Sequence, residues 1–134
     1  FRLKSKDLAL VQIDKIPSNF GIFKLSAKRA TPGAKTYTLG NPSSSGGMWI
    51  FSEGITRQIF DNFEVKYEGQ LVRAAVAQTT NPINPGDSGG PVLNSASEII
   101  GLTSGYNPAA DARLLTYAID VIEIRAIWER FVRQ

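Results

Sequence analysis

Short apolar runs separated by turn-forming residues occupy most of the chain, up to Ile119. Lys35–Leu39 and Phe63–Tyr67 alternate between apolar and polar or charged positions, the period-two pattern of a half-buried strand. Other runs have the length and composition of strands: Leu8–Ile13, Ile22–Leu25, Trp49–Phe60 with a bend or bulge at Gly54, Leu71–Ala77, Pro91–Leu93, Ile99–Thr103 and Arg113–Ile119. Turns are expected at Asp61–Asn62 and Glu68–Gln70, and loops at 40–47 and 79–90. Many short strands predict an all-β antiparallel barrel or sandwich.

The last part of the chain changes to helical spacing. Asp120 followed by Glu123 forms a start that resembles a capping box. Apolar residues then recur at three- and four-residue intervals, at Val121, Ile124, Ile127, Trp128 and Phe131. We therefore expect one C-terminal amphipathic helix whose apolar stripe packs against the core.

The composition excludes several kinds of site. The chain has 134 residues with neither cysteine nor histidine, and 43% of them are hydrophobic. The length predicts one domain, and the missing cysteines exclude disulfides, thiolate metal ligands and a cysteine nucleophile. The missing histidines remove the commonest base at neutral pH and the commonest metal ligand. We expect no cofactor and no metal site, since only a hard, oxygen-liganded ion would suit these residues.

The charge pattern argues against two classes of partner. Fifteen Lys and Arg against twelve Asp and Glu give a net charge of +3, and the basic residues are dispersed. Nucleic-acid binders concentrate such residues on one face beside stacking aromatics, so we expect no nucleic-acid partner. Apolar runs also stay well below the ~20 residues of a membrane-spanning helix.

The loop Asn84–Val92 concentrates the candidate chemistry. Glycines around Ser88 leave its hydroxyl accessible, and they permit backbone angles that aim successive N–H groups at one point. Such a nest stabilises the oxyanion that forms when a serine attacks a carbonyl. A tight glycine turn between strands is the structural alternative. The nucleophile elbow of α/β-hydrolases does not fit, because a strand-like segment and no histidine follow Ser88.

Asn84–Val92 resembles the nucleophile loop of trypsin-like serine proteases, whose run Gly-Asp-Ser-Gly-Gly-Pro is a specific short motif. The resemblance is strongest to the bacterial HtrA/DegP-type branch and continues in that branch's order along nearly the whole chain. The similar segments are Lys6–Val11, Leu39–Pro42, Ser52–Ile55, Gln78–Asn94, Glu98–Leu102 and Tyr117–Ile119. The resemblance implies a six-stranded antiparallel β-barrel, the second of the family's two barrels, with a C-terminal helix and remnant strands of the first barrel.

The same resemblance implies roles for individual residues. Ser88 would be the nucleophile, and Asp7 would orient the histidine and stabilise its charged form. The oxyanion hole would lie at Gly86, Asp87 and Ser88, formed by the backbone N–H groups of Gly86 and Ser88. Asp87 departs from the bacterial branch, where Asn is common, and agrees with the animal digestive branch. In that branch this carboxylate pairs with the N-terminus that zymogen cleavage creates, and the sequence leaves such activation open.

Substrate contacts follow from the resemblance as well. The segment Thr103, Ser104, Gly105 would pair its edge with an extended polypeptide substrate. Pro82 and Ile83 would lie at the base of the first specificity pocket, with Thr116 on the facing wall. Because none of these positions is acidic, a preference for Lys or Arg is disfavoured, and a small or medium apolar side chain is expected.

A protease of this family requires a histidine that this chain lacks. We therefore expect residues 1–30 to be a remnant of the first barrel and residues 31–134 to be the second barrel. The histidine would come from a segment upstream of Phe1 or from a second chain that completes the first barrel. The alternative is a catalytically inactive domain that binds peptides or proteins. An extracytoplasmic location, periplasmic or secreted, is expected from the family resemblance alone.

Overall fold

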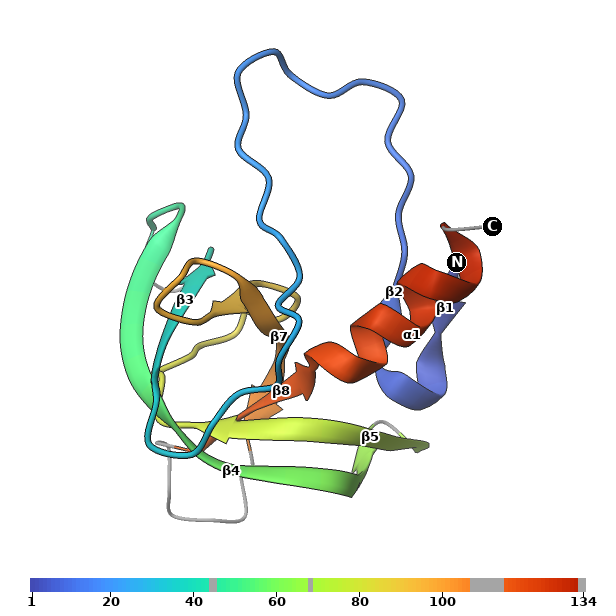
Figure 1. The fold of residues 1–134 in the computed structure, drawn as a ribbon, viewed down its shortest axis with the longest axis vertical. Helices are drawn as coiled ribbons and strands as arrows, with labels where there is room; N and C mark the ends of the chain where they lie inside the picture. Colours follow the sequence, from blue (N-terminus) through green and yellow to red (C-terminus); the bar gives the residue numbers. More distant parts are fainter. Residues whose placement is uncertain (44–45, 68, 107–114, 133–134) are drawn as a thin grey trace.

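The computed structural model describes residues 1–43, 46–67, 69–106 and 115–132 (Figure 1). Six strands form an antiparallel barrel in the order β3–β4–β5–β8–β7–β6, and β6 pairs back onto β3. The strands are β3 Lys35–Gly40, β4 Ile50–Tyr67, β5 Gln70–Thr79, β6 Pro91–Leu93, β7 Ile99–Tyr106 and β8 Thr116–Asp120. Helix α1, Val121–Phe131, follows β8 directly. The predicted all-β class, six-stranded barrel and C-terminal helix are confirmed.

The core has two parts that meet at β5 and β8. Ala77 and Ala118 pack with apolar side chains of β6 and β7 and with Ala30. Val76 and Ile119, their neighbours in sequence, pack instead with Ile127 of α1 and with Leu8 near the N-terminus. Since side chains alternate between the two faces of a strand, β5 and β8 serve both sets. Both faces of these strands are therefore buried, which explains their small and apolar residues.

The long strand β4 differs from the prediction of two strands and a turn. Its first part pairs with β3 from Ile50 to Ile55, and its second part pairs with β5 from Thr56 to Tyr67. The predicted turn at Asp61–Asn62 is wrong, because the pairing only shifts register between Phe60 and Phe63. The second register shift lies between Thr56 and Gln58, and not at Gly54, where a bend or bulge was predicted. One strand can serve two neighbours when a bulge bends it around the barrel.

The remaining boundaries change little. Strands β5 and β7 extend beyond the predicted Leu71–Ala77 and Ile99–Thr103, and β8 begins at Thr116. The predicted start of that strand at Arg113 lies outside the described residues.

Helix α1 begins as predicted but uses its first turn differently. The Asp120 side chain accepts a hydrogen bond from the Ile122 N–H at 3.0 Å, which makes Asp120 the N-cap. The Glu123 carboxylate does not complete a capping box. It accepts instead from the Ala75 N–H and from Lys6 Nζ, both at 2.8 Å. The predicted apolar stripe is only partly buried, since Trp128 remains 47% exposed.

The first thirty residues form less regular structure than predicted. β1, Arg2–Leu3, pairs with β2, Leu8–Ala9, across the 3₁₀ turn Lys4–Lys6. The predicted strands Leu8–Ile13 and Ile22–Leu25 are otherwise absent from the described chain. Residues 10–24 arch away from the barrel (Figure 1), and Leu25 makes one isolated parallel bridge with Ile99. Between these ends, residues 11–23 have no neighbouring strand in the described chain, so their backbone groups have no ladder to join.

Arg29, in the segment between this arch and β3, forms two ion pairs with the barrel. Its Nε donates to the buried Asp120 carboxylate at 2.9 Å, and its Nη1 donates to Asp61 at 2.7 Å. Burial opposes the charge of Arg29, but the hydrogen bonds to Asp61 and Asp120 outweigh it and raise the Arg29 pKa. These two ion pairs hold the chain at Arg29 against Asp61 of β4 and Asp120 at the end of β8.

Candidate active site

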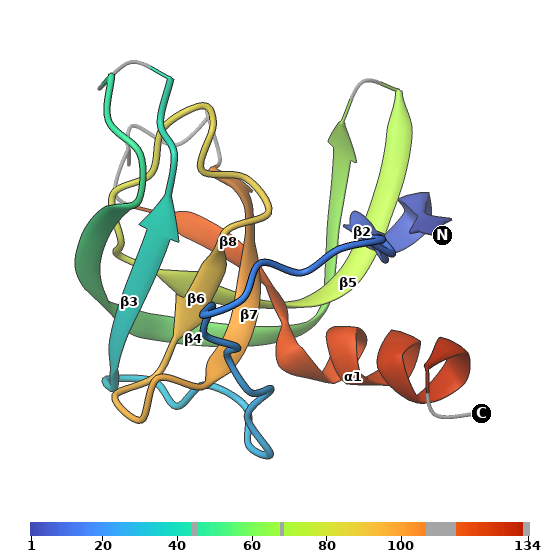
Figure 2. The same ribbon diagram turned by 90° about the horizontal axis from the view of Figure 1, so that it is seen from above.

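The loop that carries Ser88 lies at one end of the barrel, just before β6 (Figure 2). It begins with a tight turn in which the Asp87 N–H donates to the Asn84 carbonyl at 3.0 Å. The Asp87 carboxylate closes the same turn by accepting the Asn84 N–H at 2.8 Å. Gly86 lies inside the turn with a φ of +106°, and an added Cβ would lie 2.5 Å from the Asn41 carbonyl oxygen. This position therefore requires glycine on both backbone and steric grounds.

The second half of the loop is bonded to β7. The Gly89 N–H donates to the Thr103 carbonyl at 2.7 Å, and the Thr103 N–H donates to the Gly90 carbonyl at 2.9 Å. Both backbone groups of Thr103 are thus occupied, and the residue is 3% exposed. The contact between Thr103 and substrate stays a prediction; in this structure both backbone groups of Thr103 bond to the loop that carries Ser88.

Two backbone donors in the loop are left over. The N–H groups of Gly86 and Ser88 donate to no residue in the part of the chain that the structure describes. The Asp87 N–H, by contrast, is engaged by Asn84. The arrangement can therefore offer two donors to a developing oxyanion, and Asp87 supports the turn between them rather than acting as a third donor.

Ser88 and Asp7, far apart in sequence, are linked through Ser104. The Ser88 hydroxyl donates to the Ser104 carbonyl at 3.3 Å, and the Ser104 hydroxyl donates to Asp7 Oδ2 at 2.7 Å. Asp7 ends the 3₁₀ turn with a left-handed φ of 53°, and its N–H donates to the Lys4 carbonyl at 3.1 Å. A serine hydroxyl and a carboxylate therefore lie on either side of one β7 residue.

A cavity of about 320 Å³ separates the two side chains. Asp7 and Ser88 both line it, together with Arg2, Lys4, Leu8, Ala9, Gln70, Gly89, Leu102 and Thr103. The Lys6 ion pair with Glu123 holds the Asp7 turn against α1, which gives this wall of the cavity a fixed position. The space is large enough for a side chain that exchanges protons with Ser88.

The edge of β7 beside this cavity is open. Strand β6 pairs with β7 only as far as Leu102, whereas β8 pairs with the other edge through Tyr106. Residues 104–106 thus have one edge without a partner strand among the described residues. The structure places Ser104 and Gly105 of the predicted substrate segment on this edge.

The predicted specificity-pocket residues are placed unequally. Pro82 is exposed and Ile83 is half-buried, whereas Thr116 is fully buried. The Thr116 hydroxyl donates to the Asn81 carbonyl at 2.6 Å. The role of Thr116 on the facing wall of the pocket stays a prediction; in this structure its side chain anchors the chain that leads to the loop.

Asn81 is an important residue that the sequence did not reveal. It is 0% exposed, its Oδ1 accepts the Thr36 hydroxyl at 2.6 Å, and its Nδ2 donates to the carbonyls of Thr36 and Ser52. One amide thus bonds β3 and β4 together beneath the loop. Its only sequence signal was an Asn at the start of a Pro- and Gly-rich stretch, which many surface loops share.

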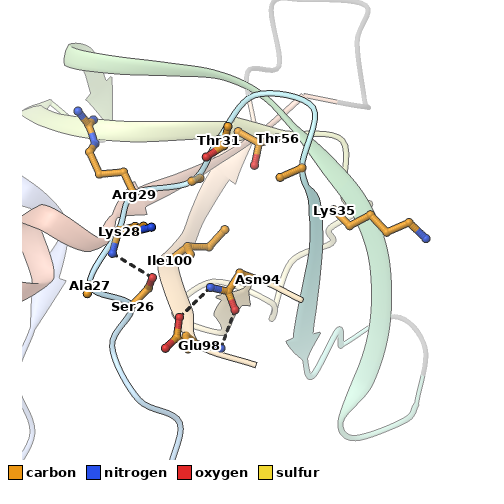
Figure 3. Close-up of a pocket in the computed structure, with 12 residues that line it drawn as sticks. Ser26, Ala27, Lys28, Arg29, Thr31, Lys35, Thr56, Asn94, Glu98 and Ile100 are labelled. Carbon is orange, nitrogen blue, oxygen red and sulfur yellow. Dashed lines mark hydrogen bonds between the residues drawn. The ribbon is translucent and has the colours of Figure 1, made fainter. Parts of the chain in front are cut away.

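A second cavity, of about 410 Å³, lies at the opposite end of β3 (Figure 3). Thr31 and Thr56 lie on one wall, and Asn94 bonds Glu98 on the other. The Thr56 hydroxyl is buried without a partner among the described residues. This cavity is separate from Ser88 and Asp7.

Two kinds of feature are absent from the described residues. No group of three or more acidic side chains is arranged to bind a metal ion. No helix there has the length and hydropathy of a membrane-spanning segment.

Comparisons with known proteins agree with this geometry. The family model of the trypsin-like peptidase domain matches residues 1–102. The serine protease Do-like HtrB of Bacillus subtilis is 27% identical over 131 residues, which cover 95% of this chain and 28% of that protein. The putative serine protease HhoB of Synechocystis sp. is 32% identical over 117 residues, which cover 86% of this chain and 26% of that protein.

Solved structures share the fold. The HtrA-type protease AlgW with a tripeptide matches with a TM-score of 0.72 at 22% identity, over 96% of this chain and 41% of that chain. The active form of a protease from M. tuberculosis matches with a TM-score of 0.69 at 20% identity, over 82% of this chain and 48% of that chain. The chain thus spans less than a third of the curated relatives named above. Because the family model of the trypsin-like peptidase domain matches residues 1–102, the chain belongs to the trypsin-like peptidase family.

Proposed function

We propose that this chain supplies the nucleophile, the oxyanion hole and the orienting carboxylate of a serine endopeptidase, and that polypeptide outside this sequence supplies the histidine. One observation carries the proposal, namely the bonded series from the Ser88 hydroxyl through Ser104 to Asp7 Oδ2. A glycine turn with no catalytic role would not require a serine hydroxyl and a carboxylate to meet at one strand.

In the proposed reaction, the histidine enters the cavity between Asp7 and Ser88. It takes the proton from Ser88 Oγ as that oxygen bonds to the peptide carbonyl carbon, and Asp7 stabilises the imidazolium. The N–H groups of Gly86 and Ser88 stabilise the oxyanion, at about 3 kcal/mol per donor. The C–N bond then breaks, the amine leaves with the proton, and an acyl-enzyme remains on Ser88. Water attacks this ester by the same steps in reverse and releases the second product.

The substrate we propose is an extended polypeptide. Its residues before the scissile bond would pair with the open edge of β7 at Ser104 and Gly105. Pro82 and Ile83 would border the first specificity pocket, where the absence of an acidic group among them favours a small or medium apolar side chain. One structural neighbour, the HtrA-type protease AlgW, is a structure with a tripeptide.

We also propose that residues 1–30 belong to a first barrel that further polypeptide completes, and that residues 31–134 form the second barrel. Support comes from the exposed apolar side chains of the arch, which include Val11 at 76% and Ile22 at 78%. Large apolar groups gathered on one segment indicate a surface that another element covers. An extracytoplasmic location remains part of the proposal and rests on the family resemblance.

The second candidate is a binding domain without catalysis, which the absence of histidine from the sequence favours. A peptide would then add a strand to the edge at Ser104 and Gly105 without being cleaved. The two candidates differ in the reactivity of Ser88, because an unactivated serine hydroxyl does not react with phosphonate esters at a useful rate.

The test is labelling by a serine-directed phosphonate ester, applied to the polypeptide or assembly that contains this chain and a histidine-bearing segment. We expect one adduct on Ser88, no adduct after Ser88→Ala, and slower labelling after Asp7→Asn. A matched control is Ser18→Ala, on the exposed arch. A folded preparation that binds peptides but leaves Ser88 unlabelled would establish the binding domain instead.

A further inference from the structure

The turn that carries Asp7 needs support from the rest of the molecule. Asp7 follows the 3₁₀ turn Lys4–Lys6 with a left-handed φ of 53°, and it is exposed. This backbone conformation is unfavourable for a residue other than glycine, and it persists where the surrounding structure holds it. The bond from the Ser104 hydroxyl fixes one oxygen of the Asp7 carboxylate but not the backbone of the turn.

Glu123 of helix α1 contacts the residue next to Asp7. The Glu123 Oε1 atom accepts a hydrogen bond from Lys6 Nζ at 2.8 Å, and the same atom accepts the Ala75 N–H at 2.8 Å. Ala75 is 2% exposed and lies one residue before Val76, where the pairing of β5 with β8 begins. The Glu123 carboxylate is therefore bonded to a buried backbone N–H of the barrel, just outside the β5–β8 ladder.

Both ends of the turn are thereby held against β5. At one end, the Lys4 carbonyl accepts the Asp7 N–H at 3.1 Å and also accepts the side-chain amide of Gln70, at the start of β5. At the other end, Lys6 is bonded to Glu123, which is bonded in turn to β5. Figure 1 shows the turn between β1 and β2 lying beside α1.

The ion pair between Lys6 and Glu123 differs from an ordinary surface pair. Its side chains are 32% and 15% exposed, whereas those of the Arg73 and Glu64 pair are 60% and 46% exposed. Exposed pairs contribute little, because water screens the charges and two long side chains must be ordered. The Glu123 carboxylate is already ordered by the Ala75 N–H, so it offers Lys6 a fixed partner.

We propose that Glu123 is a positioning residue for the reaction at Ser88: through Lys6, it holds Asp7 where the Asp7 carboxylate orients the histidine. This inference rests on the proposed serine endopeptidase function and deepens it by making helix α1 part of the support of the active site. Among the described residues, Glu123 bonds to Lys6 and Ala75 and not to Ser88. Its effect on the reaction must therefore pass through Asp7.

Two variants remove the ion pair from opposite sides, in the polypeptide or assembly that contains the histidine. Glu123→Gln removes the charge but keeps an amide oxygen for the Ala75 N–H, so the barrel should stay folded. Lys6→Met removes the ammonium group. We expect each variant to lower kcat for a small ester about fivefold, with KM unchanged, which is the upper range for a partly exposed ion pair. Lys6→Arg keeps the charge and should retain nearly full activity.

The pH profile separates a positioning role from a purely structural one. The acidic midpoint of kcat/KM reports the pKa of the histidine, which must be neutral to act as a base. A carboxylate held beside the imidazole raises that pKa, so displacement of Asp7 should lower the midpoint by about half a pH unit. Arg2 and Lys4, the other charged residues that line the cavity, are the same in every variant. Partial unfolding alone would lower the rate without moving the midpoint.

A control and a double variant complete the test. Glu129→Gln makes the same chemical change on α1, at an exposed residue that forms no ion pair with a described residue, and should change neither kcat nor the midpoint. Glu123→Gln combined with Asp7→Asn should lose little more activity than Asp7→Asn alone, because both changes act through one carboxylate.

The possible failures are distinguishable. An unchanged kcat in Glu123→Gln and Lys6→Met, or a lower kcat with an unmoved midpoint, would overturn the role of Glu123 and leave the proposed function intact. Additive losses in the double variant would also overturn it, since Glu123 would then act independently of Asp7. Absence of Ser88-dependent ester hydrolysis in the unsubstituted protein would overturn the proposed function, and this inference with it.

Discussion

Gly40 tests whether the Asp87 carboxylate holds the oxyanion loop in place. Gly40 ends β3, and a Cβ at this position would lie 2.0 Å from Asp87 Oδ1 and 3.1 Å from Asp87 Cβ. Asp87 Oδ1 is buried without a partner among the described residues, whereas Asp87 Oδ2 accepts the Asn84 N–H at 2.8 Å. Gly40→Ala must therefore push the carboxylate away and break the bond that closes the turn around Gly86.

The magnitudes predict a larger effect on catalysis than on folding. A hydrogen bond to a charged group contributes about 1.5–3 kcal/mol, so the free energy of unfolding should fall by about that amount. Displacement of one oxyanion donor costs about 10²–10³ in kcat. We expect Gly40→Ala to lower kcat for a small ester at least about 100-fold, in a preparation that contains the histidine, while the protein stays folded.

The control and the double variant sharpen this test. Gly21→Ala meets nothing within 4 Å on the exposed arch and should leave kcat unchanged. Gly40→Ala combined with Asp87→Ala should lose little more activity than Asp87→Ala alone, because the two changes act through one contact. Full activity of Gly40→Ala, or strictly additive losses in the double variant, would refute the role given to Asp87.

Two further predictions concern the supports of the site. Ser104→Ala removes the 2.7 Å hydrogen bond to Asp7. Because one charge-assisted hydrogen bond is lost, the rate of phosphonate labelling should fall about tenfold. An unchanged rate would exclude a role for that hydrogen bond. Asn81→Ala removes three hydrogen bonds of a buried side chain and should lower the free energy of unfolding by about 3 kcal/mol in urea titrations. Asn62→Ala, at an exposed position of β4, should cost less than about 0.5 kcal/mol, and an equal loss in both variants would contradict the anchoring role of Asn81.

Sequence reasoning succeeded where local chemistry decides structure. The alternation in Lys35–Leu39 predicted β3, and the Asp120 start predicted α1, because these signals act within a few residues. Reasoning failed at Asp61–Asn62, where two turn-favouring residues lie in a bulge of a continuous strand. Pairing with β5 on both sides of the bulge outweighs the local preference, and that pairing is a tertiary property.

The candidate site divides in the same way. The run from Gly86 to Gly90 predicted a glycine-shaped loop around Ser88, and the resemblance pointed to Asp7. Neither could predict that Thr103 and Thr116 are buried by the loop they support, because burial depends on the strands that close around them. The direct bond between Ser104 and Asp7 also joins residues 97 positions apart, a contact that only the closed barrel creates.

By itself, the sequence determined the class of fold, the family and the residues with chemistry to offer, since these follow from local patterns and a specific motif. The tertiary structure decided which groups are free to act. It occupied the N–H of Asp87 and left those of Gly86 and Ser88 open. The physical reason is that hydrogen-bond partners and exposure are set by distant segments, which meet only when the barrel closes.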